Sequence, residues 1–155
     1  MICSKLYRTL SLLIFSLPVL CSAQQDEATL AKTFEDVAYG QHPNQVIDFW
    51  EADVSEPAPL VIFIHGGGFK GGSHEKVDRD VIQQYLDAGI HHASVEYRFI
   101  KHARLPAAHE DVVRALQFIR SKAEEWGVDK SRIAAYGGSA GAQLVAYLAW
   151  SDDFA

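Results

Sequence analysis

Residues 60–69 read Leu-Val-Ile-Phe-Ile-His-Gly-Gly-Gly-Phe, and residues 132–141 read Arg-Ile-Ala-Ala-Tyr-Gly-Gly-Ser-Ala-Gly. In both stretches a short apolar run leads directly into a glycine-rich segment. The run Leu60–Ile64 is continuous and rich in β-branched residues, which is typical of a strand buried on both faces of a parallel sheet. The run at 132–136 predicts a second buried strand of the same kind.

Strand and helix patterns alternate around these two runs. Partial alternation at 34–39 and 45–50, on either side of the turn residues 40–44, predicts an antiparallel hairpin. The remaining periodicities predict a helix over 74–88, a strand over 90–97, a helix over 106–126 and a helix over 139–150. Such alternation is typical of right-handed βαβ units, so we expect an α/β fold with a mostly parallel sheet and flanking helices.

The first 23 residues have the pattern of a signal peptide. Lys5 and Arg8 precede the apolar stretch Leu10–Leu20, and the small residues after it predict cleavage after Ala23. The apolar stretch is shorter than the roughly 20 residues needed to span a bilayer, so an uncleaved anchor helix is the weaker alternative. We expect a secreted or periplasmic protein with no stable membrane insertion after cleavage.

Composition narrows the class of the remaining chain. The hydrophobic content of 48% is typical of a globular protein, and the net charge of −6 without any basic run makes a nucleic-acid partner unexpected. Both cysteines, Cys3 and Cys21, lie in the predicted signal peptide, so no disulfide is expected after cleavage. No linker divides residues 24–155, which we expect to form part of a single domain.

The segment Gly137-Gly138-Ser139-Ala140-Gly141, called the elbow here (residues 137–141), has the pattern Gly-x-Ser-x-Gly. A serine hydroxyl is a poor nucleophile unless its oxygen is exposed and a base lies beside it. A sharp strand-to-helix turn exposes the oxygen, but it brings backbone close to the positions two before and two after the serine. We therefore predict that Ser139 is a catalytic nucleophile and that Gly137 and Gly141 support the turn.

Residues 65–69, called the oxyanion loop, are predicted to supply hydrogen-bond donors. Acyl transfer places negative charge on an oxygen in the transition state, and each preorganised donor contributes about 3–4 kcal/mol. We predict that the backbone N–H groups of Gly67, Gly68 and Ala140 are these donors, and that His65 and Gly66 fix the shape of the loop. Neither glycine-rich segment has the Gly-Lys-Ser/Thr ending of a phosphate-binding loop, which is the alternative.

These motifs resemble the α/β-hydrolase superfamily, in particular esterases and lipases with a His-Gly-Gly-Gly loop. The hormone-sensitive-lipase-like esterases and the feruloyl or acetyl-xylan-esterase-like branch are the groups most similar to it. Further matching positions between Tyr39 and Trp150 include Asp48, Glu96-Tyr97-Arg98 and Asp111. The resemblance implies an α/β-hydrolase fold and a structural role for Arg98 and Asp111. The Leu-Ala-Pro sequence common after the Tyr-Arg pair in the lipase-like branch is absent here.

The activity implied by the resemblance is that of a serine carboxylic-ester hydrolase that forms an acyl-enzyme and uses no cofactor. Its expected substrates are acetyl, feruloyl or other short-chain esters, either small molecules or esters linked to polysaccharides. In this superfamily the triad acid and then the histidine follow the serine, whereas no histidine follows Ser139 here. We therefore expect an N-terminal half, truncated after the elbow helix, that is inactive alone.

The histidines before Ser139 suggest no substitute base and no metal site. His91 and His92 are expected at a strand edge with surface polarity, and His109 is expected to be partly exposed on the long helix. Two other functions stay open. One is a non-catalytic binding protein on the hydrolase fold. The other is a serine peptidase of the prolyl-oligopeptidase type, although such peptidases usually carry extra domains before the catalytic one.

Overall fold

The computed structural model describes residues 30–55 and 57–151, so the predicted signal peptide at 1–23 lies outside the described residues. These residues form a five-stranded sheet with the order β1-β2-β4-β3-β5. The strands are β1 (Phe34–Ala38), β2 (Val46–Trp50), β3 (Ala58–Ile64), β4 (His91–Val95) and β5 (Val128–Gly137). The helices are η1 (His74–Lys76), α2 (Arg79–Asp87), α3 (Ala107–Lys122) and α4 (Ala140–Trp150).

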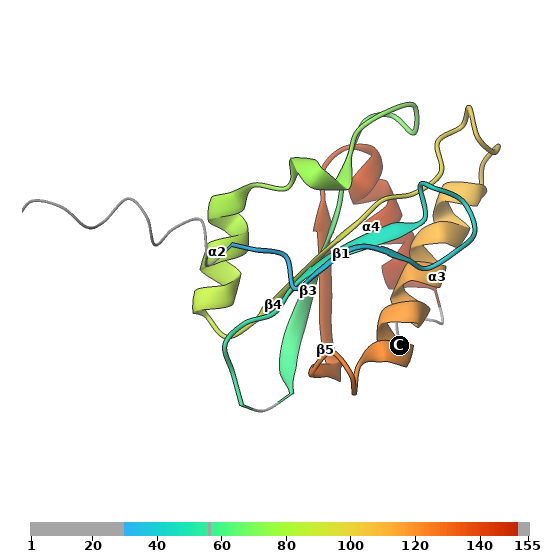
Figure 1. Cartoon of the computed structure of the whole chain (residues 1–155). Helices are drawn as coiled ribbons and strands as arrows, with labels where there is room; N and C mark the ends of the chain where they lie inside the picture. Colours follow the sequence, from blue (N-terminus) through green and yellow to red (C-terminus); the bar gives the residue numbers. More distant parts are fainter. Residues whose placement is uncertain (1–29, 56, 152–155) are drawn as a thin grey trace, which may run out of the picture.

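The sheet combines the predicted hairpin with a parallel part. Strands β1 and β2 are antiparallel, and β2 is also antiparallel to β4. Strands β4, β3 and β5 run parallel, with Ile62 of β3 opposite Ala93 on one side and Ala135 on the other. The predicted hairpin and the mostly parallel sheet are therefore confirmed. Because β4, β3 and β5 run parallel, their carboxyl ends lie at the same edge of the sheet, which holds both glycine-rich segments (Figure 1).

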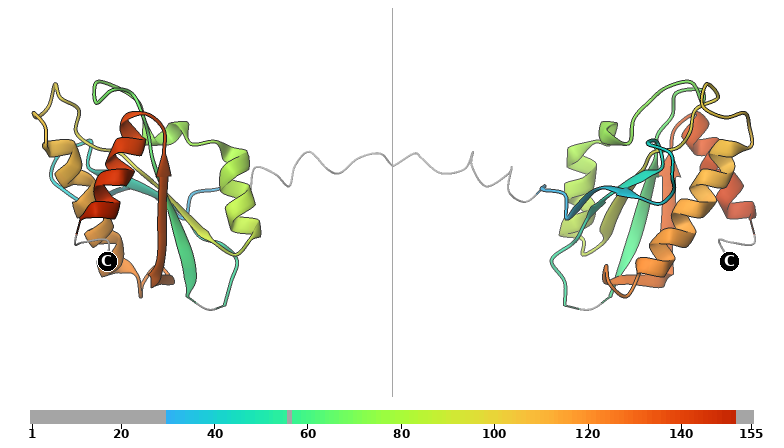
Figure 2. Two further views of the ribbon diagram at one scale, coloured as in Figure 1. Left: turned by 180° about the vertical axis from the view of Figure 1, so that it is seen from behind. Right: turned by 45° about the vertical axis from the view of Figure 1, so that its right-hand side comes forward.

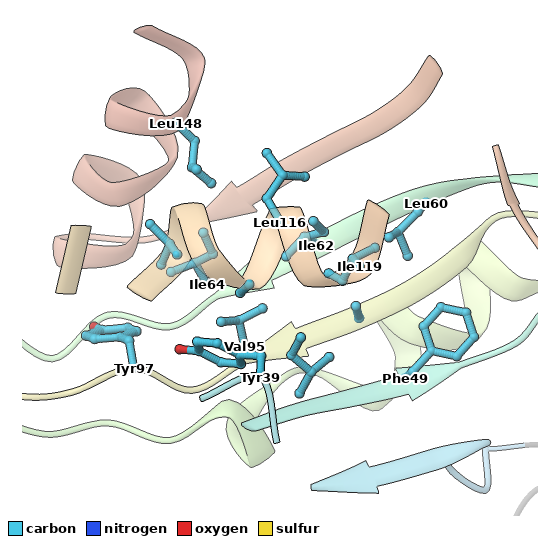
Figure 3. Close-up of a cluster of buried hydrophobic side chains, with 14 of the residues drawn as sticks. Tyr39, Phe49, Leu60, Ile62, Ile64, Val95, Tyr97, Leu116, Ile119 and Leu148 are labelled. Atoms are coloured by element: carbon cyan, nitrogen blue, oxygen red, sulfur yellow. The ribbon is translucent and has the colours of Figure 1, made fainter. Parts of the chain in front are cut away.

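Helices cover both faces of the sheet. Helix α2 lies on one face, and α3 and α4 lie side by side on the other (Figures 1 and 2). Leu116 and Ile119 of α3 and Leu148 of α4 pack onto Ile62 and neighbouring residues of β3 (Figure 3). All of these side chains are at most 2% exposed, and burial of each contributes about 1.5–3 kcal/mol. No helix in the described part of the chain is long and apolar enough to cross a membrane.

The helix predicted over 74–88 is two separate elements. The η1 turn ends at Lys76, the next residue Val77 is extended with a ψ of 140°, and α2 begins only after Asp78. The Asp78 side chain accepts a hydrogen bond from the Asp80 N–H (2.9 Å), which makes it the N-cap of a new helix. The apolar spacing continued across this break, so periodicity alone did not reveal it. The expected end at Gly89 is confirmed, because this residue has φ 71°.

His91 and His92 are buried, and the expectation of surface polarity for them was wrong. They begin β4, an inner strand of the sheet, and they are 1% and 0% exposed. His91 Nδ1 accepts the Ala52 N–H (3.0 Å), and His92 Nε2 lies 3.0 Å from the hydroxyl of Tyr136. Burial lowers the pKa of His92 to about 4, so its ring is neutral at pH 7. Strand order decided their burial, because β4 is inserted between β2 and β3.

Candidate active site

Ser139 lies in the turn between the end of β5 and the start of α4. Its backbone has φ 56° and ψ −120°, a strained conformation for a residue with a side chain. Helical hydrogen bonds begin at once, since Gly141 N–H donates to the Gly138 carbonyl (2.9 Å) and Gln143 N–H donates to the Ser139 carbonyl (3.1 Å). Ser139 is also exposed. The elbow therefore has a sharp turn that presents the serine, and the catalytic role of Ser139 stays a prediction.

Tight backbone packing explains the glycines around the elbow. A Cβ atom on Gly137 or Gly141 would overlap the carbonyl oxygen of Ile64, at the end of β3. A Cβ atom on Gly66 would lie 2.7 Å from the Gly138 carbonyl oxygen and 3.4 Å from the Cβ of the elbow serine. The oxyanion loop and the elbow are thus in direct contact.

The oxyanion loop adopts a left-handed backbone at three successive residues. The φ angles of Gly67, Gly68 and Phe69 are 127°, 61° and 59°. A Cβ atom on Gly67 would overlap the Gly71 carbonyl oxygen, whereas Gly68 has open space and favours glycine only for its φ angle. The N–H groups of Lys70 and Gly71 both donate to the Gly67 carbonyl (3.1 and 3.3 Å), which closes the turn.

The three predicted donors, the N–H groups of Gly67, Gly68 and Ala140, have no hydrogen-bond partner within residues 30–55 and 57–151. Gly67 and Gly68 are exposed, and Ala140 is the first residue of α4, where N–H groups have no partner within the helix, so all three groups can donate to a bound anion. The first N–H groups of α4 and its dipole add attraction for negative charge. That the three groups converge on one oxygen stays a prediction.

His65 has its two ring nitrogens engaged by acceptors. Nδ1 lies 2.7 Å from the carbonyl oxygen of Gly66, and Nε2 lies 2.9 Å from Oε1 of Glu96. The ring is 3% exposed and stacks on Tyr97 at 4.4 Å, whose hydroxyl donates to the His65 carbonyl (2.9 Å). Neither nitrogen is available to take a proton from Ser139, which supports the predicted role of His65 in fixing the loop.

Glu96, directly after β4, joins His65 to a second buried histidine. While Oε1 faces His65, Oε2 accepts the N–H of His74 (3.3 Å) and lies 3.2 Å from its Nδ1. Nε2 of His74 lies 3.1 Å from Oδ1 of Asp36 and 3.3 Å from Oδ2 of Asp48. A continuous chain of polar contacts therefore runs from the oxyanion loop to the β1–β2 hairpin.

The charges in this chain of contacts stabilise one another. Burial would raise the pKa of Glu96, but hydrogen bonds from His65 and His74 outweigh it and lower the pKa to about 2. Burial would lower the pKa of His74, but its hydrogen bond to Glu96 and the charge of Asp48 outweigh this effect and raise it above the ordinary 6.5. The anchor of the oxyanion loop is thus an ionised carboxylate held by imidazole rings.

The pair formed by Arg98 and Asp111 fixes the loop after β4 to helix α3. Nε and Nη2 of Arg98 donate to the two oxygens of Asp111 at 2.8 and 2.7 Å, and the Arg98 N–H adds a third hydrogen bond (2.9 Å). Asp111 is fully buried and also accepts the side-chain amide of Gln45 (2.7 Å). These contacts give Arg98 and Asp111 the structural position that the resemblance implied.

Asp36, Asp48 and His74 are the group in the described residues that could hold a cation, with possible ligand atoms within 4.8 Å of one another. Nζ of Lys32 lies 2.8 Å from Oδ2 of Asp48, where it already neutralises the buried carboxylate. His74 is engaged on both ring nitrogens, as described above. Ion pairs within the chain therefore account for this cluster.

The described residues bring no acid–base partner to the elbow. Within residues 30–55 and 57–151, no histidine or carboxylate forms a hydrogen bond with the side chain of Ser139. His109 is half-buried, as predicted, and packs between the rings of Phe69 (5.8 Å) and Tyr147 (4.8 Å). The glycine-rich segments hold the predicted nucleophile and the predicted donors, but the described residues place no base beside Ser139.

The roles of Glu96 and His74 were not predicted from the sequence. The position of Glu96 was a usable signal for a buried polar contact. An ionised carboxylate directly after a buried strand is destabilising unless a hydrogen-bonding partner compensates for its desolvation. His74 carried no local signal, since its partner Glu96 is 22 residues away. Only the docking of η1 against β4 brings the two together.

A family model described as BD-FAE matches residues 47–154 of the chain. Among curated proteins, Esterase LipC of Mycobacterium tuberculosis is 34% identical over 112 residues. This match covers 71% of the present chain but 28% of LipC, so the chain spans less than a third of that relative.

Solved esterase structures have the same arrangement of strands and helices. A bacterial heroin esterase superposes with a TM-score of 0.62 at 37% identity, over 70% of this chain and 35% of that one. A truncated form of a carbohydrate esterase from gut microbiota superposes with a TM-score of 0.68 at 26% identity, over 77% of this chain and 44% of that one. These likenesses confirm the α/β-hydrolase fold class expected from the motifs.

Proposed function

Because the chain belongs to the BD-FAE family of α/β-hydrolase esterases, we propose that it carries the nucleophile and the oxyanion hole of a serine carboxylic-ester hydrolase. The observation that carries this proposal is the strained, exposed Ser139 together with three N–H groups that have no acceptor among the described residues. Nucleophile and donors are the parts that acyl transfer needs on one side of the reacting carbonyl.

In the proposed reaction, Oγ of Ser139 attacks the ester carbonyl carbon while a histidine base takes its proton. The N–H groups of Gly67, Gly68 and Ala140 hold the negative oxygen of the tetrahedral intermediate. The bond to the alcohol oxygen then breaks, and the alcohol leaves with the proton. Water hydrolyses the acyl-enzyme by the same route and restores Ser139. We propose that the base and its acid partner lie outside these 155 residues, because no histidine follows the serine.

The test is hydrolysis of p-nitrophenyl acetate by the complete gene product that contains this chain. We expect Ser139→Ala to lower kcat about 10⁴- to 10⁶-fold, because a triad serine acts as a unit with its base. Ser55→Ala, at an exposed bend, is the matched control and should leave kcat unchanged. Full activity in the Ser139→Ala variant would refute the nucleophile, whereas tight ester binding without turnover would favour the binding-protein alternative.

The 155-residue chain alone is a second arm of this test. We expect little turnover from it, with a residual rate that Ser139→Ala does not change. Turnover that disappears in the Ser139→Ala variant would show that the chain supplies its own base and would refute that part of the proposal.

The proposed substrates are acetyl, feruloyl and other short-chain esters, including esters on polysaccharides. The likeness to a carbohydrate esterase supports the polysaccharide-linked class, and Esterase LipC supports ester chemistry in general. These classes are tested by comparing kcat/KM for an acetylated xylo-oligosaccharide, a feruloylated one, p-nitrophenyl acetate and a proline-containing peptide. A preference for a peptide bond would favour the prolyl-oligopeptidase-type alternative instead.

We also propose that the protein is exported, on the basis of the leader pattern over residues 1–23. N-terminal sequencing of the protein recovered from its producing cell should begin at Gln24. A product that begins at Met1 would contradict the proposal.

A further inference from the structure

A polar cleft of about 540 Å³ opens between the turn after β1, the loop after β4 and the first turns of α3. Its lining includes the polar side chains of His42, His102, Arg98, Arg114, Gln45 and Glu110. The volume lies in the range of small-molecule sites. The Ile100 N–H donates to the Phe69 carbonyl (2.8 Å), which ties one wall of the cleft to the oxyanion loop. None of the lining residues belongs to the elbow.

The two histidines of this cleft are hydrogen-bond donors. Nδ1 of His42 accepts the Asn44 N–H (3.0 Å), and Nδ1 of His102 accepts the Phe99 N–H (3.2 Å). A ring nitrogen that accepts a hydrogen bond carries no proton, so in each neutral ring the proton is on Nε2. The ring centroids of His42 and His102 are 4.7 Å apart, so two ring donors lie close together. The same tautomer disfavours a metal ion at Nδ1, because that lone pair is engaged.

The charged residues that line the cleft are two arginines and one glutamate: Arg98, Arg114 and Glu110. The charge of Arg98 is matched by Asp111, and Glu110 approaches Arg98 only at 3.9 Å. Arg114 forms no salt bridge with any residue that the structure describes, and it is exposed.

We propose that this cleft binds the oxyanion group, a carboxylate or a phosphate, of a small molecule. Arg114 and the Nε2–H groups of His42 and His102 are the donors to the oxyanion, and Arg98 is held in place by Asp111 beside them. Charge-assisted hydrogen bonds from arginine favour carboxylate and phosphate oxygens over neutral hydroxyl groups. The inference does not depend on the chemistry of Ser139.

Amide ¹H–¹⁵N NMR of the full chain tests the proposal with three probes that share one sugar ring: glucuronate, glucose 6-phosphate and neutral glucose. We expect one or both anions to shift the amides of residues 41–45, 98–102 and 110–114, and glucose to leave them in place. Binding of only one anion identifies the oxyanion as a carboxylate or a phosphate. Unchanged amides at about 50 mM of both anions, well above a millimolar Kd, would overturn the proposal, as would equal shifts with glucose.

Matched variants locate the site. Arg114→Gln should weaken binding of the anion about tenfold, because it removes a charge-assisted hydrogen bond. Lys130→Gln removes the same charge from an exposed position on β5 and should have no effect. His102→Asn can still accept the Phe99 N–H but lacks the Nε2–H donor, and should also weaken binding. If the Arg114→Gln and Lys130→Gln variants bound the anion with equal Kd values, the weaker binding would reflect only the loss of one positive charge, and the assigned site would be overturned.

Discussion

Substitution of Gly141 by alanine tests the packing of the elbow. A Cβ atom at this position would overlap the carbonyl oxygen of Ile64 and lie 2.8 Å from the carbonyl oxygen of His65. Both are backbone atoms at the end of β3, so they cannot rotate away as a side chain would. Either α4 or the oxyanion loop must shift to admit the methyl group.

The expected magnitude follows from two opposing terms. Overpacking against fixed backbone costs about 3 kcal/mol, at the upper end of its usual range. Alanine in place of glycine inside a helix returns about 1 kcal/mol. The net loss of about 2 kcal/mol should lower the Tm of a chain of this size by about 4–8 °C.

The neighbouring Gly138 is the matched control. No atom lies within 4 Å of a Cβ built on Gly138, and its φ angle is not in the left-handed region. Gly138→Ala should therefore change the free energy of unfolding by no more than about 0.5 kcal/mol. Thermal unfolding of the full chain followed by far-UV circular dichroism measures both variants. A Gly141→Ala variant as stable as Gly138→Ala would refute the tight approach of α4 to β3.

Three further predictions concern the buried polar groups. Asp111→Asn should lower the free energy of unfolding by about 2–4 kcal/mol in urea denaturation, because it leaves the Arg98 guanidinium, which water reaches only in part, without its counter-charge. An unchanged midpoint of unfolding would contradict this. The pKa of His74 is raised in the folded protein, so protonated His74 stabilises the fold fully below pH 6.5, and this stabilisation is lost as the pH rises through the folded pKa. His74→Gln should therefore make the free energy of unfolding less dependent on pH above 6.5. The pKa of His92, lowered by burial to about 4, predicts a loss of stability as pH falls from 6.5 toward 4, because the unfolded chain binds the proton first; His92→Phe should remove it, and an identical acid limb in that variant would argue against a neutral buried ring.

Local patterns in the sequence were sufficient for most elements and for the elbow. The apolar run Leu60–Ile64 predicted a buried strand, and the two turn glycines Gly137 and Gly141 predicted a close approach of backbone that the structure contains. These signals are local because strand burial, helix periodicity and the steric need for glycine act within a few residues. The ends of the elements were predicted less accurately, since β5 begins at Val128 and the predicted strand began at 132.

Contacts between residues distant in the chain were decided by the tertiary structure. The insertion of β4 between β2 and β3 buried His91 and His92, which their polarity alone had suggested were exposed. The bonds of Glu96 to His65 and His74 join residues 31 and 22 positions apart, and that between Gln45 and Asp111 joins residues 66 positions apart. Local sequence patterns thus determined most of the strands and helices and both glycine-rich turns. Strand order depends on pairing between residues distant in the chain. It determined which polar side chains lie in contact, and these contacts together with burial set their pKa values.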